Sequence, residues 1–293
     1  MNTSEELKQI VKDKYAKIAT QETAINASSC CGATPSSGEV YNIMTDDYSQ
    51  VEGYNPDADL ALGCGLPTAF ANIQKGDVVI DLGSGAGNDC FIARHETGAE
   101  GKVIGIDFTE PMIDKARINA DKLGFNNVEF RYGDIENMPV ADNTADVMVS
   151  NCVLNLVPNK ERVISEIYRV LKPGGHFSIS DIVLIGDLPA ELQNDAEMYA
   201  GCVSGAIQKE EYLGYIKGLG FDNMVIQKEK TIDIPYDILS KYLDAEGLAQ
   251  FKSGTTGIFS ITVYAEKPGS KTSKPKMKLS ELQDSCAPGS GCC

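Results

Sequence analysis

The nine cysteines of this 293-residue chain are its most chemically distinctive residues. Three of them stand in separate segments: Cys64 in "LALGCGLP", Cys152 in "SNCVLNL" and Cys202 in "YAGCVSGAI". Cys152 follows an apolar run that is typical of a buried strand. Because the carboxyl ends of parallel strands line the ligand crevice of a doubly wound sheet, we expect the Cys152 thiol to face a binding site.

The spacing of these three thiols favours a soft element over zinc. Structural zinc sites normally contain short C-x₂₋₄-C pairs, and no such pair occurs among Cys64, Cys152 and Cys202. Trivalent arsenic is soft and binds three sulfurs as a trigonal pyramid, with its lone pair opposite them.

The remaining six cysteines have simpler interpretations, because a free cysteine is often just a small buried hydrophobe. We expect this of Cys90; Cys30 and Cys31 are loop thiols, and Cys286, Cys292 and Cys293 lie in a polar tail where they could capture arsenic or be redox-active.

A second motif, "VVIDLGSGAGNDCFIA", predicts a strand, a glycine turn and a helix. Gly83, Gly85 and Gly87 would let the backbone approach a ligand beside the amide groups of the helix N-terminus. The dinucleotide pattern G-x-G-x-x-G would need a glycine where the chain has Asn88, which disfavours hydride transfer. Asp107, 24 positions after Gly83, is placed to accept the hydrogens of both ribose hydroxyls and to reject a 2′-phosphate. The motif therefore predicts a nucleotide-like cofactor.

The next predicted strand end carries residues suited to adenine. In "RYGDIENMPV", Asp134 would meet the adenine amine and Ile135 a face of the ring, and Met112 could cover the other face. The expected cofactor site comprises Gly83, Ser84, Gly85, Gly87, Asp107, Phe108, Met112, Asp134 and Ile135.

Short apolar runs alternate with helical stretches from Asp77 onward, which predicts an α/β fold with a mostly parallel, doubly wound, Rossmann-like sheet. Leu7, Ile10, Val11, Tyr15 and Ile18 follow helical spacing, and Thr3 with Glu6 is placed for a capping box. We expect four regions: an N-terminal helix and cysteine-bearing loop (1–73), a cofactor-binding core (74–185), a smaller C-terminal α+β substrate region that binds the arsenic (186–266), and a disordered cysteine-containing tail (267–293).

The amino-acid composition argues against some classes of binding partner. The net charge of −16 argues against a nucleic-acid partner, since such affinity comes largely from Lys and Arg. Neither a signal peptide nor a membrane-spanning run is evident, so we expect no membrane partner and a cytoplasmic location. In that compartment the thiols should be mostly reduced.

The cofactor residues, with "RVLKPGGHFSISD", resemble class I S-adenosylmethionine (SAM) methyltransferases over roughly residues 75–185. Methyl transfer to oxygen or nitrogen generally uses a general base. The only histidines, His95 and His176, are expected on a helix and at a strand start, in surface or structural roles. Arsenic needs no base, because its own lone pair is the nucleophile.

The three cysteine segments "ADLALGCGLP", "SNCVLNLVPNKERVISEIYRVLKPGG" and "GCVSGAI" resemble those of the arsenite methyltransferases, and the resemblance covers nearly all of residues 5–265. It implies methyl transfer from SAM to arsenite or methylated arsenicals. It further implies that Cys152 and Cys202 hold arsenic throughout, that Cys64 joins them, and that Cys30 or Cys31 matches a fourth family cysteine. We favour Cys30.

Methylation formally oxidises arsenic, so two electrons must be returned. A thiol pair, Cys30 with Cys64, could supply them by forming a disulfide that a cellular reductant of the thioredoxin or glutathione type resets. Two alternatives remain at this point: a SAM-dependent methyltransferase of a quinone, sterol or other small organic molecule, and a thiol-rich protein that sequesters arsenic or heavy metals.

Overall fold

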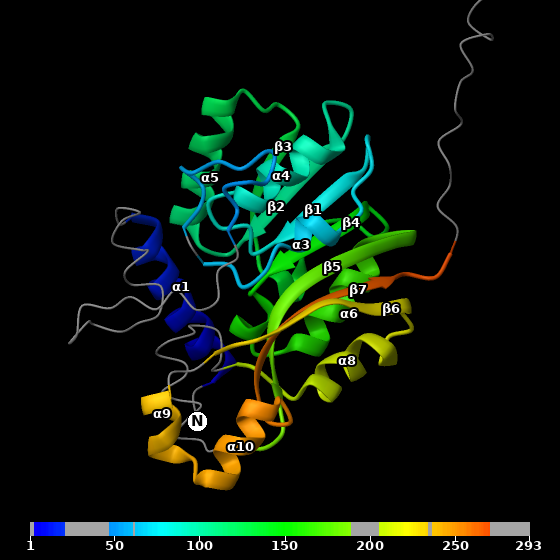
Figure 1. Ribbon diagram of the computed structural model, residues 1–293. Helices are drawn as coiled ribbons and strands as arrows, with labels where there is room; N and C mark the ends of the chain where they lie inside the picture. The colour runs from blue at the N-terminus through cyan, green and yellow to red at the C-terminus, as the bar shows by residue number, and fades with distance from the viewer. Residues whose placement is uncertain (1–2, 21–46, 61, 189–204, 234–235, 270–293) are drawn as a thin grey trace, which may run out of the picture.

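The computed structural model describes residues 3–20, 47–60, 62–188, 205–233 and 236–269. Its strands form one seven-stranded sheet in the order β3-β2-β1-β4-β5-β7-β6 (Figure 1). The first five strands pair in parallel, and β7 pairs antiparallel with both β5 and β6. The strands are β1 (Val78–Leu82), β2 (Lys102–Asp107), β3 (Val128–Tyr132), β4 (Ala145–Asn151), β5 (Leu171–Ile185), β6 (Asp222–Thr231) and β7 (Gly257–Glu266).

The strand order confirms the predicted doubly wound α/β fold. The chain runs from β1 outward through β2 to β3, then returns to place β4 on the other side of β1. In such sheets ligands bind at the carboxyl ends of the strands where the order reverses, which here means the ends of β1 and β4. The helices are α1 (Ser4–Thr20), α3 (Pro67–Phe70), α4 (Asn88–Thr97), α5 (Glu110–Leu123), α6 (Lys160–Val170), α8 (Lys209–Gly218), α9 (Tyr236–Tyr242) and α10 (Ala245–Ser253), with 3₁₀ turns η1 (Ile135–Asn137) and η2 (Leu154–Leu156).

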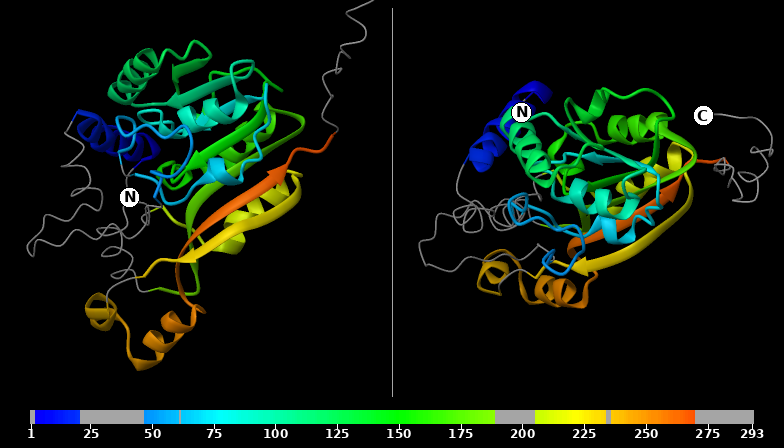
Figure 2. Two further views of the ribbon diagram at one scale, coloured as in Figure 1. Left: turned by 45° about the horizontal axis from the view of Figure 1, so that its top comes forward. Right: turned by 90° about the horizontal axis from the view of Figure 1, so that it is seen from above.

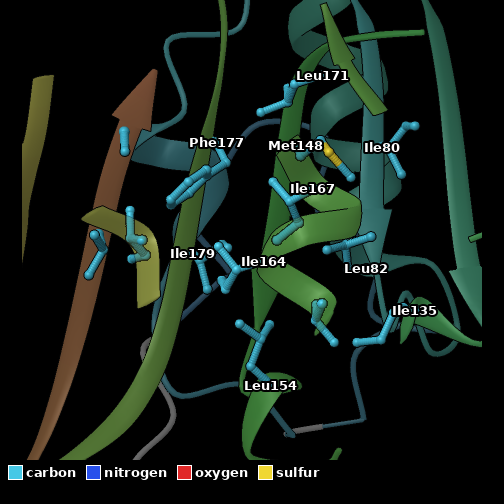
Figure 3. Packing of buried hydrophobic residues seen from close by; sticks show 14 of the residues in the cluster. Ile80, Leu82, Ile135, Met148, Leu154, Ile164, Ile167, Leu171, Phe177 and Ile179 are labelled. Atoms are coloured by element: carbon cyan, nitrogen blue, oxygen red, sulfur yellow. The ribbon is translucent and has the colours of Figure 1, made fainter. Parts of the chain in front are cut away.

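The two faces of the sheet bury separate cores because successive strand residues point to opposite sides. On one face Ile80 and Leu82 of β1 pack with Ile164 and Ile167 of α6, and Figure 3 shows these side chains within one cluster. On the other face Val79 packs with residues of α4 and α5. The apolar strand runs of the sequence therefore reflect a sheet covered on both sides.

Helix α1 begins at the predicted capping box. The Glu6 amide donates to Thr3 Oγ1 at 3.2 Å, and the Thr3 amide donates to Glu6 Oε2 at 2.7 Å. Its last turn buries Ile18, and the helix contacts α5. Helix α1 thus lies against the α5 side of the molecule (Figure 1).

The C-terminal part of the chain extends the same sheet. Strand β7 pairs with β5, and β6 pairs with β7 at the edge of the sheet. Helices α9 and α10 lie together near the end of the sheet where β5 finishes (Figure 2). Within the described residues, no helix has the length and apolar character needed to cross a membrane.

Candidate active site

A pocket opens at the carboxyl ends of β1, β2 and β4 and extends past the end of β3. Helix α1 contributes Lys8, Val11 and Tyr15 to its wall. Most of the expected cofactor residues line it, together with one of the expected thiols: Gly83, Ser84, Gly85, Asp107, Phe108, Met112, Asp134, Ile135 and Cys152.

The glycine turn supplies an open wall of this pocket. Gly85 has φ +50°, and a Cβ built on it would have only Met112 Sδ within 4.0 Å, so the backbone there is bare toward the ligand space. Gly87 does not line the pocket, and a Cβ there would lie 2.8 Å from the Phe130 ring. Gly87 therefore serves the packing of α4 on the sheet.

Asp107 stands at the end of β2 and is held by the backbone around it. Its carboxylate accepts hydrogen bonds from the Gly85 amide at 3.0 Å and from the Thr109 amide at 2.8 Å. Burial raises the pKa of this carboxyl group, and the backbone donors oppose the shift. The two amides donate to different oxygens of this carboxylate, and this orients it at the wall of the pocket.

Asp134 caps the η1 turn, where it accepts a hydrogen bond from the Glu136 amide at 2.9 Å. Its other oxygen lies 2.6 Å from Lys8 Nζ, which also pairs with the Glu136 carboxylate. Helix α1 is thus anchored by ion pairs beside the expected adenine position.

Two further carboxylates, Asp81 and Asp89, line the pocket and were not predicted from the sequence. Burial raises the pKa of Asp89 to about 6, against the lowering effect of donors from Asn151, Tyr48 and Thr68. Burial also raises the pKa of Asp81 well above its usual value. Carboxyl groups confined in this way favour a cationic ligand, because a nearby positive charge offsets the cost of ionising them.

The donors and acceptors of the pocket fit SAM. Among the described residues, the buried Ser84 Oγ and Asn88 Oδ1 have no hydrogen-bond partner, and both residues line the pocket. A buried polar atom of this kind is normally satisfied, which points to a ligand. SAM brings ribose hydroxyls, an adenine amine and two positive charges, which match the hydroxyl, amide and carboxylate groups of this wall.

Cys64 and Cys152 meet beside this pocket and are joined by a disulfide, with an S–S distance of 2.04 Å. These two residues are oxidised here, whereas the cysteines were expected to be mostly reduced. The expected pairing of Cys64 with Cys30 involves a residue outside the described part of the chain. The partner of Cys64 is decided by the fold, which places the loop around Cys64 over the end of β4. Both residues are almost fully buried, and the apolar side chains around them include Ile182, Leu239 and Phe251.

The backbone of Cys152 adopts a conformation that is uncommon for a residue with a side chain. Its φ is +59°, and its amide donates to the Ser180 carbonyl at 2.8 Å. Non-glycine residues in the left-handed region cluster at functional sites, where the surrounding structure enforces them. The end of β4 thus directs Cys152 toward Cys64.

Cys202, the third expected thiol, lies outside the described residues, but the chain near it is placed. Gly205 packs so closely on η2 that a Cβ on it would lie 1.8 Å from the Asn155 carbonyl oxygen. Cys30, Cys31, Cys286, Cys292 and Cys293 also lie outside the described residues.

The histidines occupy structural positions. His95 lies on α4 and pairs with Glu52, while His176 is buried in β5 with its Nε2 2.6 Å from the Ala71 carbonyl oxygen. Neither lines the pocket. Cys90 is fully buried, as expected of a packing residue, and its Sγ donates to Asp81 at 3.2 Å.

Comparisons with known proteins agree with this geometry. A family model described as a methyltransferase domain matches residues 73–220. An arsenite methyltransferase from Halobacterium salinarum is 39% identical over 275 residues, which cover 90% of this chain and 67% of the relative. Another from Aquipseudomonas alcaligenes is 32% identical over 258 residues, covering 86% and 71%.

A solved structure gives the same result. The arsenic (III) S-adenosylmethionine methyltransferase from Chlamydomonas reinhardtii is 33% identical with a TM-score of 0.58, and the match covers 70% of this chain and 68% of that one. The chain belongs to the arsenite methyltransferase family, within the larger family of methyltransferase domains.

Proposed function

We propose that this enzyme transfers methyl groups from SAM to trivalent arsenic, as arsenite and methylated arsenicals, held by its cysteine thiols, and that the reaction serves arsenic detoxification. The observation that carries the proposal is the convergence of the Cys64 and Cys152 sulfur atoms beside the cofactor pocket. The Cys64 and Cys152 sulfur atoms are bonded to each other in the disulfide. After reduction they need to move apart only modestly to bind a single arsenic atom between them.

The cofactor is held by the residues at the strand ends. Asp107 accepts from the ribose hydroxyls, Asp134 from the adenine amine, and Ile135 and Met112 cover the faces of the ring. When bound, SAM supplies an electrophilic methyl group on a sulfonium that leaves as a neutral thioether. Proper orientation of two reactants supplies about 7 to 11 kcal/mol of barrier reduction, so positioning by these residues accounts for much of the catalysis.

Arsenic is bound by the reduced thiols. A reductant opens the Cys64–Cys152 disulfide, and arsenite, As(OH)₃, then exchanges its three hydroxyls for the sulfurs of Cys64, Cys152 and Cys202 with release of three waters. The lone pair of arsenic, opposite the sulfurs, attacks the methyl carbon. No base is needed, in keeping with the structural positions of His95 and His176.

Reduction completes the cycle. Methylation takes arsenic formally to the pentavalent state, and a dithiol returns two electrons as it closes to a disulfide. Cys30 is proposed as the thiol that exchanges with Cys64 in this step. The disulfide is then reset by a cellular reductant of the thioredoxin or glutathione type, which the reducing cytoplasm supplies.

Arsenic speciation tests the proposal. Reduced protein incubated with arsenite, SAM and thiol should yield methylated arsenicals, separated by chromatography. Cys152→Ser should abolish this product yet keep its SAM affinity by calorimetry, because a hard hydroxyl poorly replaces a soft sulfur ligand. Cys90→Ser is the matched control, and it should retain turnover.

Two other outcomes identify the alternatives. SAM binding without arsenic turnover in the wild-type protein would favour an organic acceptor. Arsenic binding without SAM binding would favour a sequestering protein.

A further inference from the structure

The backbone of Cys64 is held from both sides by side chains of distant strands. Cys64 lies in the loop before α3, in neither a helix nor a strand. Its amide donates to Asn151 Oδ1 at 3.0 Å, and its carbonyl accepts from Ser260 Oγ at 2.7 Å. Asn151 ends β4 and Ser260 lies on β7. The place of the Cys64 thiol therefore depends on side-chain contacts with the sheet.

The side-chain amide of Asn151 forms hydrogen bonds with the backbone of Cys64 and of the next residue, Gly65. While Oδ1 accepts from the Cys64 amide, Nδ2 donates to the Gly65 carbonyl at 2.8 Å. This pair of contacts needs a donor and an acceptor bonded to the same carbon, as in a side-chain amide, and aspartate would lose the donor. Asn151 also immediately precedes Cys152, so one residue links the positions of both sulfurs.

The loop fits closely on this amide. A Cβ at Gly63 would lie 2.6 Å from Asn151 Nδ2, and a Cβ at Gly65 would lie 2.5 Å from Ser180 Oγ. Distances below 3.0 Å would force a displacement of the loop. The glycines on either side of Cys64 in the sequence are thus explained by the close approach of the loop to β4 and β5.

Asn151 is itself held in orientation by a buried polar group. Its Nδ2 contacts Tyr48 Oη and lies 3.4 Å from Asp89 Oδ2, and Tyr48 in turn donates to Asp89 at 3.1 Å and contacts the Gly65 carbonyl. All three Nδ2 neighbours are oxygens and the Oδ1 neighbour is an N–H group. The amide is therefore locked in one orientation.

We propose that Asn151 is a positioning residue for Cys64, whose amide holds the Gly63–Cys64–Gly65 loop at the distance from Cys152 at which both sulfurs bind one atom. The inference deepens the proposed arsenic chemistry and rests on it for its role in turnover. One part of the proposal does not involve arsenic. Asn151 sets the effective concentration of the Cys64 thiol at the Cys152 thiol.

The dithiol–disulfide equilibrium of Cys64 and Cys152 measures this effective concentration. We would equilibrate the full-length protein in glutathione redox buffers, alkylate it, and quantify the two peptides by mass spectrometry. Asn151→Ala should lower the effective concentration about tenfold, as expected for the loss of hydrogen bonds worth somewhat over 1 kcal/mol. Asn151→Asp, which keeps the shape and loses the donor, should lower it too. Ser260→Ala should give a smaller decrease in the same direction.

Asn119→Ala is the matched control. Asn119 is also a buried asparagine bound to a backbone carbonyl, that of Ala86 at 3.2 Å, but it lies on α5 away from the loop. It should leave the equilibrium unchanged. SAM affinity and circular dichroism identify variants that fold. If Asn151→Ala does not fold, Asn151→Asp and Ser260→Ala carry the test.

An unchanged equilibrium in folded Asn151 variants would overturn the proposal, and so would an equal decrease in Asn119→Ala, which would indicate general loosening. A decrease confined to the Asn151 and Ser260 variants supports it. This readout is separate from the proposed function: if wild-type protein fails to methylate arsenite while the thiol equilibrium responds as expected, positioning stands and the arsenic chemistry is wrong.

Discussion

Asp107 joins the glycine turn to the end of β2, and both of its oxygens are already oriented by backbone amides. Asp107→Ala should weaken SAM binding by about 1.5 to 3 kcal/mol, as for a lost hydrogen bond to a charged group. Asp107→Asn, which keeps one acceptor for these amides, should lose less. Isothermal calorimetry measures both, and an unchanged affinity in Asp107→Ala would remove this carboxylate from the cofactor site.

Individual residues of the site were predictable from the sequence where they belong to a local sequence motif. Asp107 ends a recognisable strand and Cys152 follows one, and both line the pocket. Asn151 carries no such signal, because its partners Tyr48 and Asp89 lie 103 and 62 residues away along the chain. Asp89 likewise looks like an ordinary helix N-terminal carboxylate until the fold buries it beside Tyr48. Contacts between distant segments, and not residue type, give these side chains their role.

Gly205 is the first described residue after Cys202, the proposed third arsenic ligand, and it packs against η2. An alanine Cβ at Gly205 would overlap the Asn155 carbonyl, so the segment must move. Since misplacement by about 1 Å can cost a hundredfold in rate, Gly205→Ala should lower arsenite methylation by about that factor. SAM binding should persist, because Gly205 does not line the pocket.

Gly214 provides the control for this substitution. It lies within α8, and a Cβ there would meet nothing within 4 Å. Gly214→Ala should retain activity and gain about 0.5 to 1 kcal/mol of stability, as alanine is the better helix former. Arsenic speciation and denaturant unfolding measure the two effects. Wild-type turnover in Gly205→Ala would show that the position of this segment does not govern arsenic capture.

Elements were predictable where periodicity was strong and local. The strand and glycine-turn pattern predicted β1 and α4, and the capping box predicted the start of α1. The sequence did not predict that α1 would cross to the cofactor pocket, since its Lys8 pairs with Asp134, 126 residues away. Nor did it predict the irregularity within β5, where Gly174 has φ +77° and the register with β4 shifts between Leu171 and His176. There the Gly174 amide donates to the Lys267 carbonyl at 2.9 Å.

At the scale of the whole molecule, the C-terminal residues complete the sheet and surround the thiols. Strand β7 inserts between β5 and β6 and supplies Ser260 to the Cys64 carbonyl. Leu239 of α9 and Phe251 of α10 pack in the cluster that contains the disulfide. The sequence predicted a smaller C-terminal α+β region but not the place of its strands within the sheet. Strand order depends on pairing between residues far apart, which alternation of apolar residues does not specify.

The Cys64–Cys152 disulfide should stabilise the folded protein. It joins residues separated by 88 positions in the sequence, and a cross-link of that span restricts the unfolded chain by about 4 to 5 kcal/mol in the chain-entropy model. Reduction should therefore lower the free energy of unfolding by up to about that amount. Denaturant unfolding of oxidised and phosphine-reduced protein measures the difference, a phosphine being used because a thiol reductant would compete for arsenic.

Arsenite should restore much of the stability lost on reduction. A ligand that binds only the folded state stabilises it by RT ln(1 + [L]/Kd), about 2.7 kcal/mol at a hundredfold excess over Kd. An arsenic atom bound to Cys64 and Cys152 would also replace the broken cross-link. The Cys64→Ser, Cys152→Ser double variant should respond neither to reductant nor to arsenite at this site. Equal stabilisation of that variant by arsenite would locate the captured arsenic on other thiols, because Cys90 would then be the one cysteine left among the described residues.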